Sequence, residues 1–293
     1  MLHYERHIEE HVFELHEELQ SGNWRHGNYE PFTICDPKQR LIHKATVGDR
    51  LVHQAIVSTI EPAFERQFIY DSYSCRKGKG THAAVARLKS FLRVVSQNNT
   101  RTVYALKCDI KQFFATIDHT ILRKLLAVHI QDKGVLALLD EVIDSLSTAP
   151  GKGIPLGNIT SQLFANIYLH ELDWFVKQKL GEKYYLRYCD DFILISHSRK
   201  HLESLIQSII DFLERDLKLA MHPDKITIRM WTQGIDYLGY VLKPHCTVLR
   251  HKTKKRALNR VTAKNISSYS GLCQHVDAKE LNNLLQVVAW SRD

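Results

Sequence analysis

Several features that mark other protein classes are missing from this 293-residue sequence. It has no run of the roughly 18 apolar residues that a membrane span needs, and its start shows no secretory signal pattern. The six cysteines include no C-x-x-C pair, which argues against a zinc site and a disulfide framework. Internal repeats and low-complexity segments are also missing. We therefore expect a globular, cytoplasmic protein with reduced thiols and no membrane contact.

The charge balance points to a polyanionic partner. The sequence has 40 Lys and Arg residues and 32 Asp and Glu residues, which give a formal net charge of +8. Five basic residues gather between Arg250 and Arg256. A solvated surface is one interpretation of this cluster, but we favour a surface that follows phosphates. The residues expected to touch nucleic acid there are Lys252, Lys254 and Lys255.

Two adjacent aspartates, Asp190 and Asp191, stand between the β-prone runs 184–186 and 192–195. This pattern predicts a hairpin with a charged turn. Buried carboxylates need a cation, and oxygen ligands suit Mg²⁺. On this stretch alone, an Asp-rich turn that faces water is an equally good interpretation. A third aspartate, Asp109, ends the apolar strand that begins near Thr102, and three aspartates on two strands favour a metal site.

Two further segments carry cations at expected turns. Asp36-Pro37 lies between alternating runs, so a hairpin should project Lys38 and Arg40, which suit a triphosphate or form a solvated turn. Residues 68–82 interleave glycines with basic residues before a helix expected from Thr81. No G-K-[ST] of P-loop spacing occurs, so we expect a nucleic-acid backbone at this segment. The basic residues concerned are Arg76, Lys77 and Lys79.

The remaining periodicities predict the framework. Helices are expected over 3–20, with Ile8, Val12, Leu15 and Leu19 on the inward face, and over 49–64 and 201–219. A Gly/Pro-rich loop at 151–157 precedes a long helix. Residues 235–241 are expected to form one strand with a glycine that admits close backbone approach.

Taken in order, these segments resemble the sequence blocks of reverse transcriptases. R-Y-C-D-D at 187–191 looks like the polymerase Y-x-D-D block, and D-I-K-Q-F-F at 109–114 looks like the first catalytic aspartate block. The D-P-K-x-R finger, the S-Y-x-x-R-x-G-K-G-T-H segment and the primer-grip-like Y-L-G-Y strand match in order and spacing. The resemblance runs from about residue 30 to 245.

The block at 153–162 narrows the resemblance. Pro155-Leu156-Gly157 and Ser161-Gln162 are similar to the reverse transcriptases of diversity-generating retroelements, within the bacterial and phage enzymes related to group II introns. That family implies copying of a template-repeat RNA into cDNA with errors opposite adenine, and an oligomeric accessory variability protein. A retron-like or phage-defence reverse transcriptase without a mutagenic role is the alternative. A non-catalytic RNA-binding scaffold is disfavoured because all three aspartates are present.

The resemblance also implies a fold and residue roles. It implies an α+β right-hand polymerase with fingers (1–108), a palm with an antiparallel sheet and packed helices (109–235, with part of the fingers near 120–152), and a primer grip with a short helical thumb (236–293). Asp109 and Asp190, with Asp191 and the Ile110 carbonyl, would hold two Mg²⁺ ions, and Lys225 would protonate pyrophosphate. The residues implied to contact the incoming dNTP are Lys38, Arg40, Phe114, Leu156, Gly157 and Gln162, and those implied to contact the primer–template include Tyr237 and Gly239.

Overall fold

The structure is a computed structural model that describes residues 7–35, 39–276 and 278–291. By its internal contacts the chain forms two compact units. The first unit consists of the chain up to Tyr70, Ile110–Gly181 and Ser208–His222, and the second of Asp71–Asp109, Glu182–Gln207 and the chain from Pro223. This division differs from the three predicted parts, whose boundaries stay a prediction. Across the described ranges, no helix is long and apolar enough to cross a membrane.

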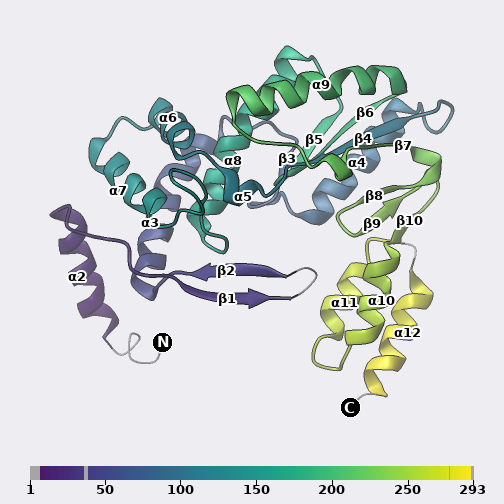
Figure 1. Ribbon diagram of the computed structural model, residues 1–293. Coiled ribbons are helices and arrows are strands. Elements are labelled where there is room, and N and C mark those ends of the chain that lie inside the picture. Colours follow the sequence, from purple (N-terminus) through teal and green to yellow (C-terminus); the bar gives the residue numbers. More distant parts are fainter. Residues whose placement is uncertain (1–6, 36–38, 277, 292–293) are drawn as a thin grey trace. The chain divides into compact units, whose positions relative to one another are not determined.

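A five-stranded sheet organises the second unit, with strand order β3-β5-β6-β4-β7 (Figure 1). The strands are β3 (Ser72–Tyr73), β4 (Tyr104–Asp109), β5 (Tyr185–Tyr188), β6 (Asp191–Ser196) and β7 (Thr227–Met230). Four of them pair antiparallel, as predicted, because β5 and β6 form a hairpin and β4 lies between β6 and β7. The short β3 runs parallel to β5, so the sheet is mixed at this edge.

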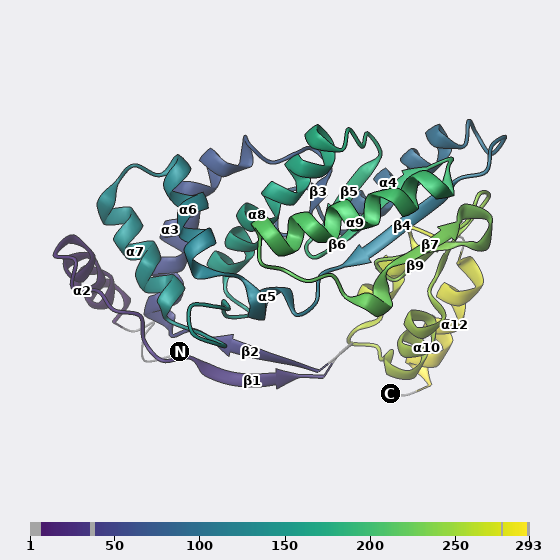
Figure 2. The same ribbon diagram turned by 45° about the horizontal axis from the view of Figure 1, so that its top comes forward.

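Helix α4 (Thr81–Val95) covers one face of this sheet (Figure 2). Its apolar residues Leu88 and Leu92 are fully buried in one core with Ile193 and Ile195, which alternate along β6. Helix α9 (Arg199–Asp216) begins in this unit and ends in the first one. The strands β5 and β6, buried on both faces over most of their length, support the residues at their ends.

A second sheet and three helices complete this unit. The prediction of one strand over 235–241 is wrong: β8 (Ile235–Tyr237) turns back into β9 (Tyr240–Leu242), which pairs with β10 (Thr247–Leu249). Leu238 and Gly239 lie between them with φ of 49° and 91°, as a two-residue hairpin turn requires. The apolar run hid this turn because Leu238 is not a usual turn residue. The helices that follow are α10 (His251–Arg260), α11 (Ile266–Cys273) and α12 (Lys279–Trp290).

The first unit is mostly helical and carries a separate hairpin, β1 (Glu30–Ile34) with β2 (Arg40–Lys44). Its helices are α2 (Ile8–Gln20), α3 (Val47–Glu65), α5 (Phe113–Thr116), α6 (His119–His129), α7 (Lys133–Asp144) and α8 (Ile159–Trp174). α8 is buried on most of its sides and contacts α3 and α6. The predicted inward face of α2 is not buried: Ile8 and Val12 are each 47% exposed, and no residue of this helix is buried.

Candidate active site

The sheet register brings the three predicted aspartates together within the second unit. Asp109, the last residue of β4, lies opposite Asp191, the first residue of β6. Asp191 also pairs with Tyr188 across the β5–β6 hairpin, so that Cys189 and Asp190 form its two-residue turn. Two strand ends and one tight turn therefore hold three carboxylates at one end of the sheet.

The three aspartates differ in their contacts with the ammonium groups of lysines. Lys107 Nζ lies 3.1 Å from Asp191 Oδ2, and both side chains are mostly buried. Lys225 Nζ lies 2.5 Å from Asp109 Oδ1. Lys107 precedes Asp109 by two residues, so strand alternation places both on the same face of β4. Asp191 thus has its own buried counter-ion, whereas Asp190 faces the negative charge of Asp109.

The protonation of the hairpin carboxyl groups follows from this arrangement. Burial raises the pKa of Asp190, and the charge of Asp109 raises it further. Burial raises the pKa of Asp191 to about 6, although the ammonium of Lys107 opposes the shift. Both groups would be easier to ionise beside an added cation. The site is therefore expected to attract a positively charged ion.

Tyr237 of β8, which is predicted to contact nucleic acid, lies beside Lys107. Its side chain is fully buried, and its hydroxyl has no hydrogen-bond partner within the described residues. Lys107 Nζ lies 5.7 Å from the centre of its ring. Burial raises the pKa of the Tyr237 hydroxyl well above its usual value. The ring supports Lys107 from within the core, and a contact of Tyr237 with nucleic acid stays a prediction.

The turn that carries Asp190 is held by the neighbouring strands. Cys189 has φ of 54°, a left-handed conformation that is unfavourable for a residue with a side chain. Its N–H donates to the Tyr73 carbonyl at 3.2 Å, and Arg187 Nη1 donates to the Cys189 carbonyl at 3.1 Å. Arg187 is fully buried. These bonds fix the turn and hence the position of Asp190.

A hollow of about 270 Å³ opens beside Asp109. Its charged lining residues are Lys107, Asp109, Asp224, Lys225, Arg229, Asp236 and Arg250. Arg250 forms an ion pair with Asp236, and its Nε donates to the Asp236 carboxylate at 2.7 Å. The hollow therefore has basic and acidic side chains side by side, most of which are paired with aspartates.

The donor set fits a hard divalent cation in its chemistry. Three carboxyl groups supply oxygen ligands of the kind Mg²⁺ prefers, and Asp191 Oδ1 is buried without a hydrogen-bond partner among the described residues. In the described part of the chain, however, no three ligand side chains are clustered closely enough to hold an ion as they stand. Lys107 and Lys225 lie on two of the carboxylates instead. Ile110, whose carbonyl is the fourth predicted ligand, follows Asp109 directly and has a buried side chain.

The residues predicted to contact the dNTP belong to the first unit, and the structure brings several of them together. The His43 N–H of β2 donates to the Leu156 carbonyl at 2.9 Å, and the Ile154 N–H donates to the Phe114 carbonyl at 2.8 Å. A Cβ on Gly157, where φ is 110°, would lie 2.6 Å from Ile42 Cγ2. The loop 153–157 is therefore fastened both to the β1–β2 hairpin and to α5. Arg40 and Gln162 are exposed, Phe114 and Leu156 are half-buried, and Lys38 lies outside the described residues.

The predicted nucleic-acid residues lie on the second unit. Lys252, Lys254 and Lys255 are exposed on α10, and Lys77 is exposed in the loop before α4. Arg76 donates to the Ser72 carbonyl at 2.8 Å, and Lys79 lies 5.2 Å from the centre of the Tyr73 ring. Arg76 and Lys79 thus brace this loop. The Gly239 carbonyl accepts from the Arg250 N–H at 2.8 Å, which ties the β8–β9 turn to the start of α10.

Sequence reasoning missed two residues of this site, Lys107 and Arg187. The position of Lys107, two residues before Asp109 on a strand, was a signal that could have identified it. Arg187 gave no such signal, because an arginine within an apolar run is expected to be exposed, and only the folded structure shows that it is buried. Lys107 contacts Asp191 directly, whereas Arg187 positions Asp190 through its hydrogen bond to the Cys189 carbonyl.

Comparison with known proteins places the chain in a family. The family model described as reverse transcriptase (RNA-dependent DNA polymerase) matches residues 35–242. Protein YkfC of Escherichia coli is 27% identical over 277 residues, covering 78% of this chain and 70% of that protein. The group II intron-encoded protein LtrA of Lactococcus lactis is 24% identical, covering 76% of this chain and 48% of that protein.

Solved structures agree at the level of the fold. Telomerase from Candida albicans, solved with a fragment of telomeric RNA, has a TM-score of 0.59 at 14% identity, covering 90% of this chain and 54% of that one. Apo telomerase from Candida tropicalis has a TM-score of 0.57. The chain spans about half the length of these telomerases and of LtrA. The α+β fold of a sheet with packed helices is thus confirmed, and the match over residues 35–242 shows that the chain belongs to the reverse transcriptase family.

Proposed function

We propose that this protein is an RNA-directed DNA polymerase whose active site is formed by Asp109, Asp190 and Asp191. The observation that carries the proposal is the register that sets Asp109 opposite Asp191, with Asp190 in the turn between β5 and β6. Asp109 and Asp190 would hold two Mg²⁺ ions, with the Ile110 carbonyl as a further ligand. Bound there, the ions would supply activation of a primer 3′ hydroxyl and neutralisation of the leaving pyrophosphate.

The protein's own side chains would perform the remaining tasks. Lys38 and Arg40 on the β1–β2 hairpin would hold the triphosphate, and the Phe114 ring would oppose a ribose 2′ hydroxyl and so select deoxynucleotides. Lys225, whose ammonium lies beside Asp109 at the site, would give a proton to pyrophosphate. Asp191 would stay paired with Lys107 and contribute charge rather than constant ligation. A primer-extension assay on an RNA template, with dNTPs and with rNTPs, tests the activity.

We further propose the diversity-generating subtype, in which a template-repeat RNA is copied with errors opposite adenine to diversify a target gene. Leu156 supports this proposal. Its carbonyl fastens the loop to β2, and its half-buried aliphatic side chain cannot hydrogen-bond to a nucleotide. An oligomeric accessory variability protein would be the expected partner. A genomic template repeat with a matching variable repeat would distinguish this subtype from a retron-like enzyme.

Replacing Leu156 with Gln should lower misincorporation opposite template adenine by about tenfold. A side-chain amide that hydrogen-bonds to the correct pair alone would widen the free-energy gap by about 1.4 kcal/mol, which corresponds to tenfold in selectivity. The measurement is sequencing of cDNA made from one defined RNA. Leu156→Met, which keeps the side chain apolar, is the matched control. An error rate that is the same in Leu156→Gln as in the unaltered protein would refute this role of Leu156.

Mg²⁺ should stabilise the protein more strongly above pH 6 than below it. The pKa of Asp191 is raised to about 6 and that of Asp190 is also raised, so protons compete with the metal at lower pH. Without metal, the sign is reversed: stability should fall as the pH rises from about 4 to about 6, because the folded state then loses protons that it binds more tightly than the unfolded chain does. Thermal melts with and without Mg²⁺ at about pH 5.5 and 8 measure both effects. An equal Mg²⁺-induced rise in Tm at the two pH values would contradict the assignment.

A further inference from the structure

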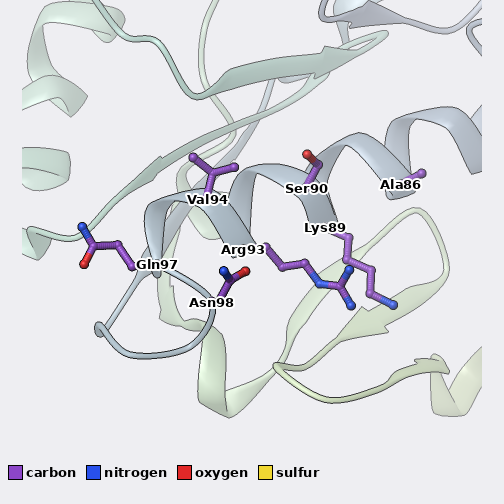
Figure 3. Close-up of a pocket in the computed structure, with 7 residues that line it drawn as sticks. All are labelled: Ala86, Lys89, Ser90, Arg93, Val94, Gln97 and Asn98. Carbon is purple, nitrogen blue, oxygen red and sulfur yellow. The ribbon is translucent and has the colours of Figure 1, made fainter.

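One face of α4 carries a polar groove that the proposed polymerase chemistry does not use. It has a volume of about 360 Å³ and is lined by Ala86, Lys89, Ser90, Arg93, Val94, Gln97 and Asn98. The helical members are spaced three or four residues apart, so they form one stripe along the helix. Figure 3 shows Lys89 and Arg93 extending from the same side of α4, with Asn98 of the following turn on that side as well.

The groove has two cations and no acid. Neither Lys89 nor Arg93 forms an ion pair with any described residue. They are four residues apart on a helix, where two like charges destabilise the helix. Arg93 lies in the last turn, where the helix dipole stabilises its positive charge. Lys89 lies a full turn earlier, where the dipole stabilises a positive charge only weakly. An anion in the groove would remove this repulsion.

The end wall of the groove is a rigid turn in an unusual conformation. Gln97, Asn98 and Asn99 follow one another with φ of 50°, 55° and 72°, all left-handed. Ser96, fully buried, holds them: its hydroxyl accepts from the Asn99 N–H at 2.9 Å and donates to the Arg93 carbonyl at 3.1 Å. Gln97 and Asn98 line this end of the groove, and an amide side chain can donate a hydrogen bond to an anion.

The groove lies away from the aspartates of the same unit. The turn at 96–101 leads into β4 at Tyr104, whereas Asp109 is the last residue of that strand. The length of the strand separates its two ends by about 17 Å at 3.3 Å per residue. A ligand at the groove would therefore not be the nucleotides that react at the aspartates.

We infer that this groove binds the sugar–phosphate backbone of an RNA segment outside the active site, an inference that rests on the proposed RNA-copying function. Lys, Arg, Ser, Asn and Gln are the side chains that contact phosphates and sugars without reading sequence. A protein partner would need apolar or aromatic anchors. Val94 is the one large apolar residue that lines the groove in the described part of the chain. The groove would hold the template RNA while its copied part moves through the site.

The test compares two charge-matched double variants. Lys89→Ala/Arg93→Ala should weaken binding of a single-stranded RNA of about 60 nucleotides by about tenfold and reduce the slope of log affinity against log salt by about one to two. Extension of a short primer–template should stay within about twofold. Lys124→Ala/Lys133→Ala removes two exposed charges from α6 and α7 and should leave RNA affinity unchanged. Equal loss in both variants, or no loss in the first, would overturn the inference.

A footprint on the unaltered protein gives an answer even if a variant fails to fold. The same RNA should protect Lys89 from an amine-reactive reagent and leave Lys124 reactive, as read by mass spectrometry. Unprotected Lys89 at saturating RNA would also overturn the inference, and protection by an acidic polypeptide but not by RNA would assign the groove to a protein. A protein that binds RNA here yet extends no primer would refute the proposed polymerase while leaving the groove assigned.

Discussion

Asp190→Asn should reduce primer extension on an RNA template by about a thousandfold or more. The substitution keeps the size of the side chain and removes the charge that would hold a divalent ion, which contributes several kcal/mol to the transition state. The same variant should melt at a higher temperature than the unaltered protein at about pH 8. The pKa of Asp190 is raised by burial and by Asp109, so its ionised form is unfavourable in the metal-free fold.

These two readouts together separate a metal site from a structural aspartate. If Asp190 has a structural role, its replacement should lower both the stability and the activity of the protein. If it is a metal ligand, its replacement should lower the activity but raise the stability of the metal-free protein. Asp224→Asn is the matched control, because Asp224 is exposed and lines the same hollow beside Asp109. It should change extension by less than about threefold. Asp190→Asn with extension similar to that of Asp224→Asn would refute the assigned site.

Lys107→Met should destabilise the folded protein by about 2 kcal/mol at neutral pH. It leaves the Asp191 carboxylate among buried side chains without the ammonium that lies 3.1 Å away. Lys107 lowers the pKa of Asp191, so its loss raises that pKa further above its ordinary value of 3.8. The destabilisation should therefore be small below about pH 4 and should grow as the pH rises past 6, where Asp191 is ionised. Urea unfolding across this pH range measures it.

A double-mutant cycle identifies Asp191 as the cause. Asp191→Asn in the Lys107→Met background should restore most of the lost stability, because no buried charge then lacks a counter-ion. Lys107→Arg keeps the charge and should lose little. If Asp191→Asn adds its own destabilisation to that of Lys107→Met instead, the two residues are not coupled and the pairing is not what stabilises the site.

The aspartates of the candidate site could be predicted from the sequence, but which charged groups pair with one another in the site could not. Local patterns placed Asp109 at a strand end and Asp190 in a turn, because apolar β-prone runs stop at both positions. They could not show that Lys107 neutralises Asp191 while Asp190 faces Asp109, since this depends on the register of two strands in which the paired residues Asp109 and Asp191 are 82 positions apart. The buried Tyr237 illustrates the same limit: the Y-L-G-Y segment was predicted to lie within one strand, but the left-handed pair Leu238-Gly239 turns it into a hairpin in which Tyr237 is buried.

The amino-acid sequence by itself determined most of the strands and helices, the identity of the three aspartates and the family resemblance, because short-range periodicity and motif spacing are local properties. The tertiary structure alone decided which charges meet. It buried Arg187 under the turn, set Lys107 against Asp191 and Lys225 against Asp109, and left Lys89 and Arg93 on α4 without an acid. Electrostatic energy falls as charges move apart and rises with burial, so these pairings depend on distances and burial in the folded protein. Neither the distances nor the burial can be obtained from the order of residues along the chain.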